Sequence, residues 1–385
     1  MAEVTLPFGK EKMKVTIPDN RLNGILVSRA NKFQADKPEE GIVKDALAHP
    51  IHSKRLRELA KGKDNIVLIA SDHTRPVPSK VIVPGVLEEI KAGNPNAKIT
   101  ILIATGFHRP TTREELIYKF GEDIVDREDI TFAVHKSHED ADMIELGTLP
   151  SGGKLKINKI AAEADLLIAE GFIEPHFFAG FSGGRKSVLP GVSSAATVMA
   201  NHCSEFIASD YARTGVLEGN PIHRDMIYAA EQAKLAFIIN VVLDENKKVI
   251  RAYAGDFNEA HREGCRFVDQ MSGVDAIPSD IVISTNGGYP LDQNIYQSVK
   301  GMTAAEASCN SGGVIIMVSS CIDGHGGQSL YDTFASGEDK NVIMQRFLDT
   351  PGQNDSGPVG STDFVQSAVT SQSHHGNTGT EAAGQ

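Results

Sequence analysis

Short, continuous apolar segments alternate along the chain with segments whose apolar residues recur at helical spacing. The segments 65–70 and 98–104 have strand length and are apolar at nearly every position, which is typical of strands in a parallel sheet covered on both faces. Between and after them, 81–92 and 111–120 have helical spacing. The sequence therefore predicts an α/β fold with mostly parallel sheets and right-handed crossovers. Further strands are expected at 4–6, 14–17, 130–134, 165–169, 236–243 and 248–253, and further helices at 53–60 and 258–271.

The alternation stops at residues 272–280 and then starts again, which indicates a second α/β domain. The elements expected in it are a strand at 281–284, a helix at 295–309 and a strand at 313–318. We predict an N-terminal α/β domain over 1–274 and a shorter C-terminal α/β domain over 275–350. The tail, 351–385, has no Lys or Arg and few apolar residues. Because such a composition buries too little surface to offset its ordering entropy, the tail is predicted to be disordered.

Composition narrows the range of functions. The 385 residues include 38 Lys and Arg against 50 Asp and Glu, a formal charge of −12, so binding of nucleic acid over the whole surface is not expected. No run of about 18 apolar residues predicts a membrane span, and residues 1–6 lack the pattern of a signal peptide. Four cysteines without CxxC spacing favour reduced thiols in a cytoplasmic enzyme; they are Cys203, Cys265, Cys309 and Cys321.

Three expected strands each run into a polar cluster, at 71–76, 105–110 and 170–186. In parallel α/β sheets, sites form beyond the carboxyl ends of the strands. Two histidines at these ends, His108 and His176, can serve as acid and base in either direction, because imidazole titrates near neutrality. A symmetric pair of this kind suits racemisation or epimerisation. The arginines of the clusters can bind a carboxylate or phosphate.

The glycine-rich segment 180–184 admits another interpretation. It fits the G-x-S-x-G pattern of a serine hydrolase, with Ser182 as nucleophile. That pattern needs the serine directly at a strand-to-helix turn, whereas about a dozen residues separate Ser182 from the expected strand. We expect instead that these glycines let the backbone approach a ligand. Neither a G-x-G-x-x-G segment after the first apolar strand nor a P-loop motif is present.

The other histidines are weighed by their sequence context. His202 can be a metal ligand or simply a histidine at a helix end, and its context leaves both open. The tail histidines are expected to have no role; they are His374 and His375. Solvated side chains are expected for five in helical or polar contexts; they are His49, His52, His135, His138 and His261.

At these clusters the sequence resembles the lactate racemase family that uses a nickel-pincer nucleotide. The resemblance covers roughly residues 1–350. It rests on five separate segments, which are 72–76, 105–110, 174–191, 201–202 and 296–301. It implies a 2-hydroxy-acid racemase with lactate as the small substrate, and a dependence on the enzymes that make the cofactor.

The resemblance also implies roles for individual residues. The cofactor is a nicotinic-acid-derived mononucleotide that holds Ni(II) in a sulfur–carbon–sulfur pincer and is linked covalently to Lys186. His202 is the implied nickel ligand, and His108 and His176 are the implied acid/base pair. Asp72 is the implied contact to the ribose. Thr74 is also assigned to the cofactor.

The implied substrate contacts come from both expected domains, so substrate is expected in the cleft between them. They are Arg75, Tyr296, Gln297 and Lys300. In the implied reaction the α-hydrogen of lactate leaves as hydride, which avoids a dianion, and returns to the other face of pyruvate.

The sequence departs from the family pattern at its C-terminal end. The family has a further α/β segment after about residue 350, with a Trp near the active site, whereas this chain has no Trp. Phe364 is the aromatic residue at a comparable place. The departure motivates an alternative, a family member that binds the nickel cofactor without catalysis or that acts on another hydroxy acid.

Overall fold

The computed structural model describes residues 1–349 and consists of two compact units. One unit comprises 27–202 and 209–274; the other comprises 1–26, 203–208 and the chain from 275 onward. Both are built from helices and parallel strands, so the predicted α/β class is confirmed. The tail after 350 and Phe364 lie outside the described residues.

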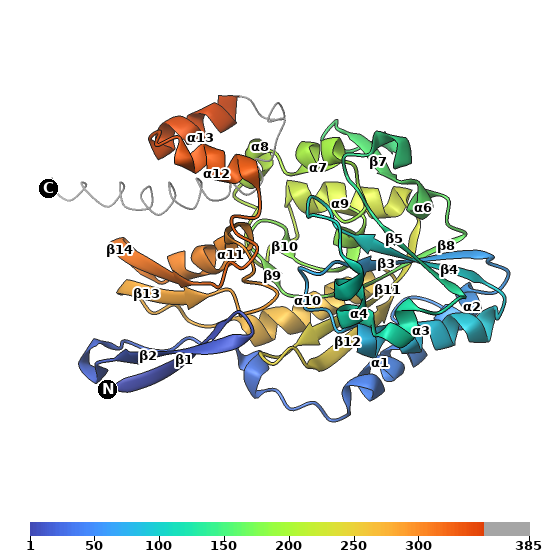
Figure 1. The fold of residues 1–385 in the computed structure, drawn as a ribbon, viewed down its shortest axis with the longest axis horizontal. Coiled ribbons are helices and arrows are strands. Elements are labelled where there is room, and N and C mark those ends of the chain that lie inside the picture. The colour runs from blue at the N-terminus through green and yellow to red at the C-terminus, as the bar shows by residue number, and fades with distance from the viewer. Residues whose placement is uncertain (350–385) are drawn as a thin grey trace, which may run out of the picture. The chain divides into compact units, whose positions relative to one another are not determined.

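A six-stranded sheet forms the centre of the larger unit (Figure 1). Its order is β12-β11-β8-β3-β4-β5, and every pair is parallel except β11 with β12 at one edge. All six strands were predicted within a few residues. Their bounds are β3 Asn65–Ser71, β4 Lys98–Ala104, β5 Ile130–Val134, β8 Leu166–Phe172, β11 Leu235–Leu243 and β12 Val249–Gly255.

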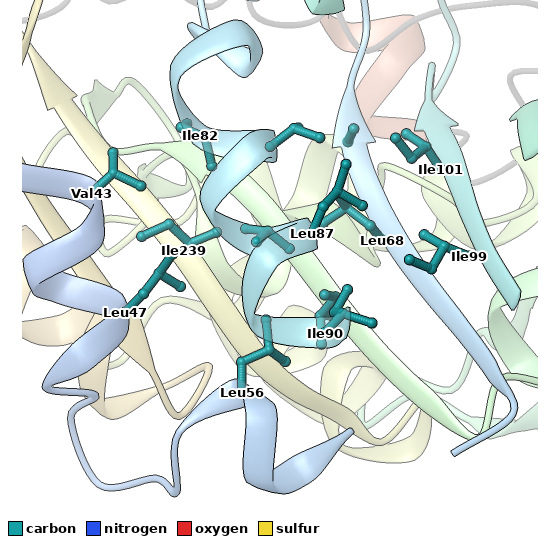
Figure 2. Close-up of a cluster of buried hydrophobic side chains, with 14 of the residues drawn as sticks. Val43, Leu47, Leu56, Leu68, Ile82, Leu87, Ile90, Ile99, Ile101 and Ile239 are labelled. Carbon is teal, nitrogen blue, oxygen red and sulfur yellow. The ribbon is translucent and has the colours of Figure 1, made fainter. Parts of the chain in front are cut away.

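Helices cover both faces of this sheet, which explains its continuous apolar strands. On one face, α1 (Glu39–Ala48), α2 (Leu56–Leu59) and α3 (Ser79–Gly93) pack against β3, β4 and β11. Figure 2 shows Val43, Leu47, Leu56, Ile82, Leu87 and Ile90 of these helices over Leu68, Ile99, Ile101 and Ile239 of the strands.

The opposite face of β11 and β12 is covered by α10 (Glu259–Ser272). Successive residues of a strand point to opposite faces. Accordingly, Val241 joins the cluster beneath α1 and α3, whereas Val242 joins Cys265 and Val268 of α10.

Several elements of this unit were not predicted from the sequence. They include α1 and the antiparallel hairpin of β6 (Met143–Thr148) and β7 (Lys154–Asn158). The helix predicted at 111–120 is α4, which is found at Arg113–Phe120. The remaining elements are α5 Glu122–Val125, α6 Lys159–Ala162, β9 Pro175–His176, β10 Gly180–Phe181, α7 Ala195–Asn201 and α9 Pro221–Gln232.

The other unit contains two small sheets. β1 (Ala2–Phe8) and β2 (Glu11–Ile17) form the predicted hairpin, and β13 (Ser279–Thr285) pairs in parallel with β14 (Cys309–Val318). The hairpin was predicted to belong to the N-terminal domain, whereas the contacts of its strands assign it to the unit that contains the chain from residue 275 onward. The helices are α8 Ser204–Ile207, α11 Ile295–Glu306, α12 Gln328–Ala335 and α13 Lys340–Asp349.

Two hydrogen bonds fasten the hairpin within its unit. The Gly9 amide donates to Asp292 Oδ2 at 2.7 Å, and Thr285 Oγ1 donates to the Pro7 carbonyl at 3.0 Å.

Among the described residues, no helix has the length and apolar character needed to cross a bilayer.

Candidate active site

The carboxyl ends of β3 and β4 bring the first two polar clusters together. These strands are parallel and paired in register, with Ser71 opposite Ala104. The residues that follow are therefore neighbours: Asp72 and Thr74 after β3, and His108 after β4. The rule that sites form at strand ends correctly predicted this gathering.

Asp72 and His108 form a hydrogen-bonded pair. Asp72 is 1% exposed, and its Oδ2 lies 2.6 Å from His108 Nδ1. Its Oδ1 accepts the Thr74 amide at 3.1 Å and Thr74 Oγ1 at 2.7 Å. Burial by itself raises the pKa of Asp72, but the charge and hydrogen bond of His108, with the charge of Arg75, lower that pKa well below its usual range. The carboxylate is thus ionised and accepts the Nδ1 proton, so proton exchange by His108 falls to Nε2.

Arg75 is held from two sides. Its Nη1 donates to Thr74 Oγ1 at 2.6 Å, and its carbonyl accepts from Lys119 Nζ at 3.2 Å. Lys119 also donates to the Val77 carbonyl at 3.3 Å. Burial lowers the pKa of Lys119. Lys119 was not predicted from the sequence, although it follows Leu116 by three residues on the buried stripe of α4.

The third cluster gathers around one phenylalanine. The ring of Phe178 lies 4.5 Å from that of His176 and 5.1 Å from that of His202, centroid to centroid. Lys186 Nζ lies 5.6 Å from the centre of the same ring. Three residues predicted for the site therefore surround Phe178, which is buried and was not predicted.

Backbone contacts orient His176. It lies on β9, opposite Gly180 of β10, and its Nδ1 accepts the Ala179 amide at 3.3 Å. Neutral imidazole carries one proton, so in this arrangement the proton of His176 is on Nε2.

His202 has a ring nitrogen without a hydrogen-bond partner. The residue is the C-cap of α7, and its side chain is buried with no hydrogen-bond partner at Nδ1. Burial, with the charge of Lys186, lowers the pKa of His202 to about 3, so the ring is neutral. A neutral imidazole with an unused nitrogen can bind a transition metal. In the part of the chain that the structure describes, no group of three or more His, Cys, Asp or Glu could hold a metal ion.

Two histidine predictions are wrong. His135 and His261 were expected to be solvated, but both are buried. His135 Nε2 lies 3.0 Å from the Ser193 carbonyl, and Thr105 Oγ1 donates to the His135 carbonyl at 2.7 Å. His135 thereby connects the segment before His108 with the segment after Lys186.

Two glycines of 180–184 are required by the packing of the protein itself. Gly183 and Gly184 both have positive φ. A Cβ at Gly183 would lie 2.7 Å from Asn240 Oδ1, and one at Gly184 would lie 2.7 Å from the His261 ring. These glycines let the backbone approach the protein core, and the expected approach of a ligand to the same segment stays a prediction.

Ser182 does not have the surroundings of a nucleophile. Its Oγ donates to the Phe172 carbonyl at 2.9 Å and accepts the Glu174 amide at 2.8 Å. His261 Nε2 lies 2.7 Å from the Ser182 carbonyl oxygen. The hydroxyl is a structural group within the loop, which contradicts the serine hydrolase alternative.

The remaining predicted residues lie on α11. Asn294 caps this helix, since its side chain accepts the Gln297 amide at 2.9 Å. Gln297 is buried, whereas Tyr296 and Lys300 are half-buried. Tyr296 and Lys300 are four residues apart and lie on the same helix face. Their role as substrate contacts stays a prediction.

Comparisons with known proteins identify the family to which the chain belongs. The profile of the lactate racemase N-terminal domain matches residues 8–215, and that of the lactate racemase C-terminal domain matches residues 274–357. A lactate racemase of Thermoanaerobacterium thermosaccharolyticum is 59% identical over 348 residues, which cover 90% of this chain and 81% of that protein. A lactate racemase of Lactiplantibacillus plantarum is 57% identical over 351 residues, 91% of this chain and 82% of that protein.

Solved structures give the same result. The lactate racemase apoprotein from T. thermosaccharolyticum superposes with a TM-score of 0.86 and 55% identity, over 96% of this chain and 86% of that chain. A protein of Thermotoga maritima shares the fold at 19% identity, with a TM-score of 0.67 over 86% of this chain and 84% of its own. With both domain profiles matched and identities near 60% over most of its length, the chain belongs to the lactate racemase family.

Proposed function

We propose that this chain is an isomerase that interconverts D- and L-lactate. Family membership supports the reaction class. The observation in the structure that supports it best is the pair of Asp72 and His108, joined at 2.6 Å at the carboxyl edge of the sheet. A histidine whose Nδ1 is held by a carboxylate is poised to exchange protons through Nε2.

We propose further that Lys186 and His202 hold a nickel-pincer nucleotide. The buried, unpartnered Nδ1 of His202 fits one nickel ligand, and neutral imidazole is the form that binds metal. Lys186, whose Nζ lies 5.6 Å from the centre of the Phe178 ring, is the group for covalent attachment. When bound, the cofactor supplies an acceptor for the α-hydrogen as hydride. Such a cofactor makes the chain dependent on the enzymes that synthesise it.

The two histidines would handle the proton of the lactate hydroxyl. The α-hydrogen of lactate is a poor acid because the neighbouring carboxylate is already anionic. Loss of the hydroxyl proton to one histidine, together with loss of the α-hydrogen as hydride, would convert lactate to pyruvate without a dianion. Racemisation would be completed by return of the hydride to the opposite face of the carbonyl carbon and by a proton from the other histidine to the oxygen. Asp72 stabilises the imidazolium when the proton is on His108.

Cationic side chains would bind the substrate carboxylate. Arg75 is oriented by Thr74 Oγ1 and by the bond from Lys119 to its carbonyl. We propose Arg75 and Lys300 as carboxylate contacts, with Tyr296 and Gln297 beside the substrate. Because both its guanidinium and its backbone carbonyl are hydrogen-bonded, Arg75 loses little conformational entropy when it binds a carboxylate.

The test is an assay of holoprotein produced together with the cofactor-synthesis enzymes. Intact mass reports the adduct on Lys186, metal analysis reports nickel, and chiral chromatography reports lactate. We expect the adduct, nickel, and conversion of either enantiomer to a racemic mixture. Lys186→Ala is the control that should lack adduct and activity.

The non-catalytic alternative predicts a different result in this experiment. It is motivated by the absence of Trp from the chain. Adduct and nickel without any change in lactate would favour it, after which other 2-hydroxy acids would be tested in the same sample. Protein without adduct would contradict the proposed cofactor.

A further inference from the structure

Arg185 is a fully buried cation among neutral partners. Its side chain is 0% exposed, and it lies in the short helical turn Gly184–Ser187. Burial lowers the pKa of Arg185 to about 10, so the guanidinium remains charged at neutral pH. Its Nε donates at 3.0 Å to Nδ1 of His223, whose pKa is lowered by burial to about 3. Burying a charge is costly unless hydrogen bonds compensate for the lost water, so the bonds made by this guanidinium must offset its desolvation.

The guanidinium hydrogen-bonds to the segment that precedes it. Nη2 donates to the Ala179 carbonyl at 2.7 Å, and Nη1 donates to the Phe181 carbonyl at 2.8 Å. Nη1 also lies 3.4 Å from the Gly183 carbonyl. The donors of a guanidinium have a fixed planar geometry. One side chain therefore binds three alternate carbonyls of this loop, which is held as well by the pairing of β9 with β10 and by the Asn220 side chain, whose Nδ2 donates to the Phe178 carbonyl.

This loop carries two residues of the proposed reaction. His176 is at its start, and its Nδ1 accepts the amide of Ala179, the residue whose carbonyl Arg185 binds. Lys186, the proposed attachment site, directly follows Arg185. Arg185 is thus connected through Ala179 to the ring of His176, and through the chain to Lys186.

We propose that Arg185 is a positioning residue that holds the segment from His176 to Lys186 and keeps the His176 ring oriented with its proton on Nε2. The inference rests on the proposed function for the role of His176. Its structural part concerns the apoprotein and stands on the hydrogen bonds alone. A displacement of about 1 Å of a catalytic group can cost about 100-fold in rate.

The main test compares Arg185→Lys with Arg262→Lys. Lysine keeps the charge at 185 but has no fork to bind several carbonyls. Arg262 is a nearby arginine whose guanidinium bonds to Glu218 and Asn258, so its replacement controls for the loss of a guanidinium in this region. Hydrogen exchange of the apoprotein is followed by mass spectrometry, and kcat of the holoprotein is expressed per Lys186 adduct.

We expect Arg185→Lys to speed amide exchange in residues 176–184 while the rest of its unit is unchanged, and to lower kcat about 10- to 100-fold with little change in KM. Arg262→Lys should do neither. Unchanged local exchange, or unchanged kcat per adduct, would overturn the proposal. If the unaltered holoprotein does not racemise lactate, the proposed function fails, whereas the exchange result still decides whether Arg185 holds the segment.

A milder pair of variants covers the case in which Arg185→Lys does not fold. His223→Leu removes the acceptor for Arg185 Nε, and His223→Asn retains an oxygen close to the position of Nδ1. We expect faster exchange at 176–184 in His223→Leu and restoration towards the unaltered rate in His223→Asn. Equal exchange in both variants and in the unaltered protein would contradict the proposal.

Discussion

Replacement of Asp72 with Asn is expected to change which ring nitrogen of His108 carries the proton, while the other hydrogen bonds of residue 72 stay in place. The Asn oxygen can still accept the Thr74 amide and hydroxyl, which bond to Oδ1 at 3.1 and 2.7 Å. The amide nitrogen, however, would take the position of Oδ2, 2.6 Å from His108 Nδ1. Because this nitrogen donates, Nδ1 must accept, and the ring proton moves to Nε2. His108 can then no longer accept a proton at Nε2.

The size of the effect follows from the contribution of acid–base catalysis. A positioned acid or base contributes about 100- to 10,000-fold to rate, which corresponds to about 3–5 kcal/mol of activation free energy. We expect kcat of Asp72→Asn to fall within this range. KM should change little, because the bond from Arg75 to Thr74 Oγ1 is untouched. The two enantiomers have equal free energies, so kcat/KM must fall equally for D- and L-lactate.

The assay follows lactate by chiral chromatography, with rates expressed per Lys186 adduct and with nickel measured in the same sample. Asp165→Asn is the matched control, since Asp165 Oδ2 accepts two amides, those of Asp64 and Asn65, at the opposite edge of the sheet. An unchanged kcat in adduct-bearing, nickel-loaded Asp72→Asn would refute the role of the pair.

Three further predictions concern the metal ligand, the substrate anchor and pH. His202→Leu should lose nickel and retain the Lys186 adduct, and its apoprotein should be no less stable, because an unpaired buried nitrogen is removed; bound nickel in this variant would contradict the assignment. Lys119→Met should raise KM for lactate severalfold with kcat nearly unchanged, because the carbonyls of Arg75 and Val77 lose their donor; an unchanged KM would contradict this reasoning. Burial lowers the pKa of His135 to about 4, and of His202 and His223 to about 3, from 6.5. The unfolded chain therefore binds more protons, so their contribution to stability is present above about pH 6.5 and is lost as the pH falls towards 4. Urea unfolding of the apoprotein should show this loss, and the free energy of unfolding of His135→Gln should depend less steeply on pH. Equal stability of the unaltered protein at pH 7 and pH 5 would contradict the prediction.

Much of the fold could be predicted because buried parallel strands have a distinctive pattern. Strands such as β4 are apolar at nearly every position, and β4 was predicted at its observed bounds. The missed α1 begins with two glutamates and contains Gly41, so its buried stripe of Ile42, Val43 and Leu47 is short. The hairpin of β6 and β7 was missed because neither strand has a long apolar run.

The site was predictable only at the level of strand ends. The positions of Asp72 and His108 follow from the parallel sheet, but their pairing depends on side-chain directions that the sequence does not show. Phe178 and Lys119 were missed because neither an apolar ring nor a lysine on a helix indicates in the sequence which groups it contacts. Arg185 was grouped with the arginines expected to bind a carboxylate or phosphate, whereas it binds carbonyls of its own loop. The burial of His261 could have been predicted from its spacing, because it precedes Cys265 by four residues and Val268 by seven on the buried stripe of α10.

The most direct test of the account is the racemisation of lactate by holoprotein whose Lys186 adduct and nickel have been verified. The account predicts that either pure enantiomer is converted to an equal mixture, and that Lys186→Ala, prepared in the same way, leaves both enantiomers unchanged. Holoprotein that carries adduct and nickel but leaves D- and L-lactate unchanged would contradict it.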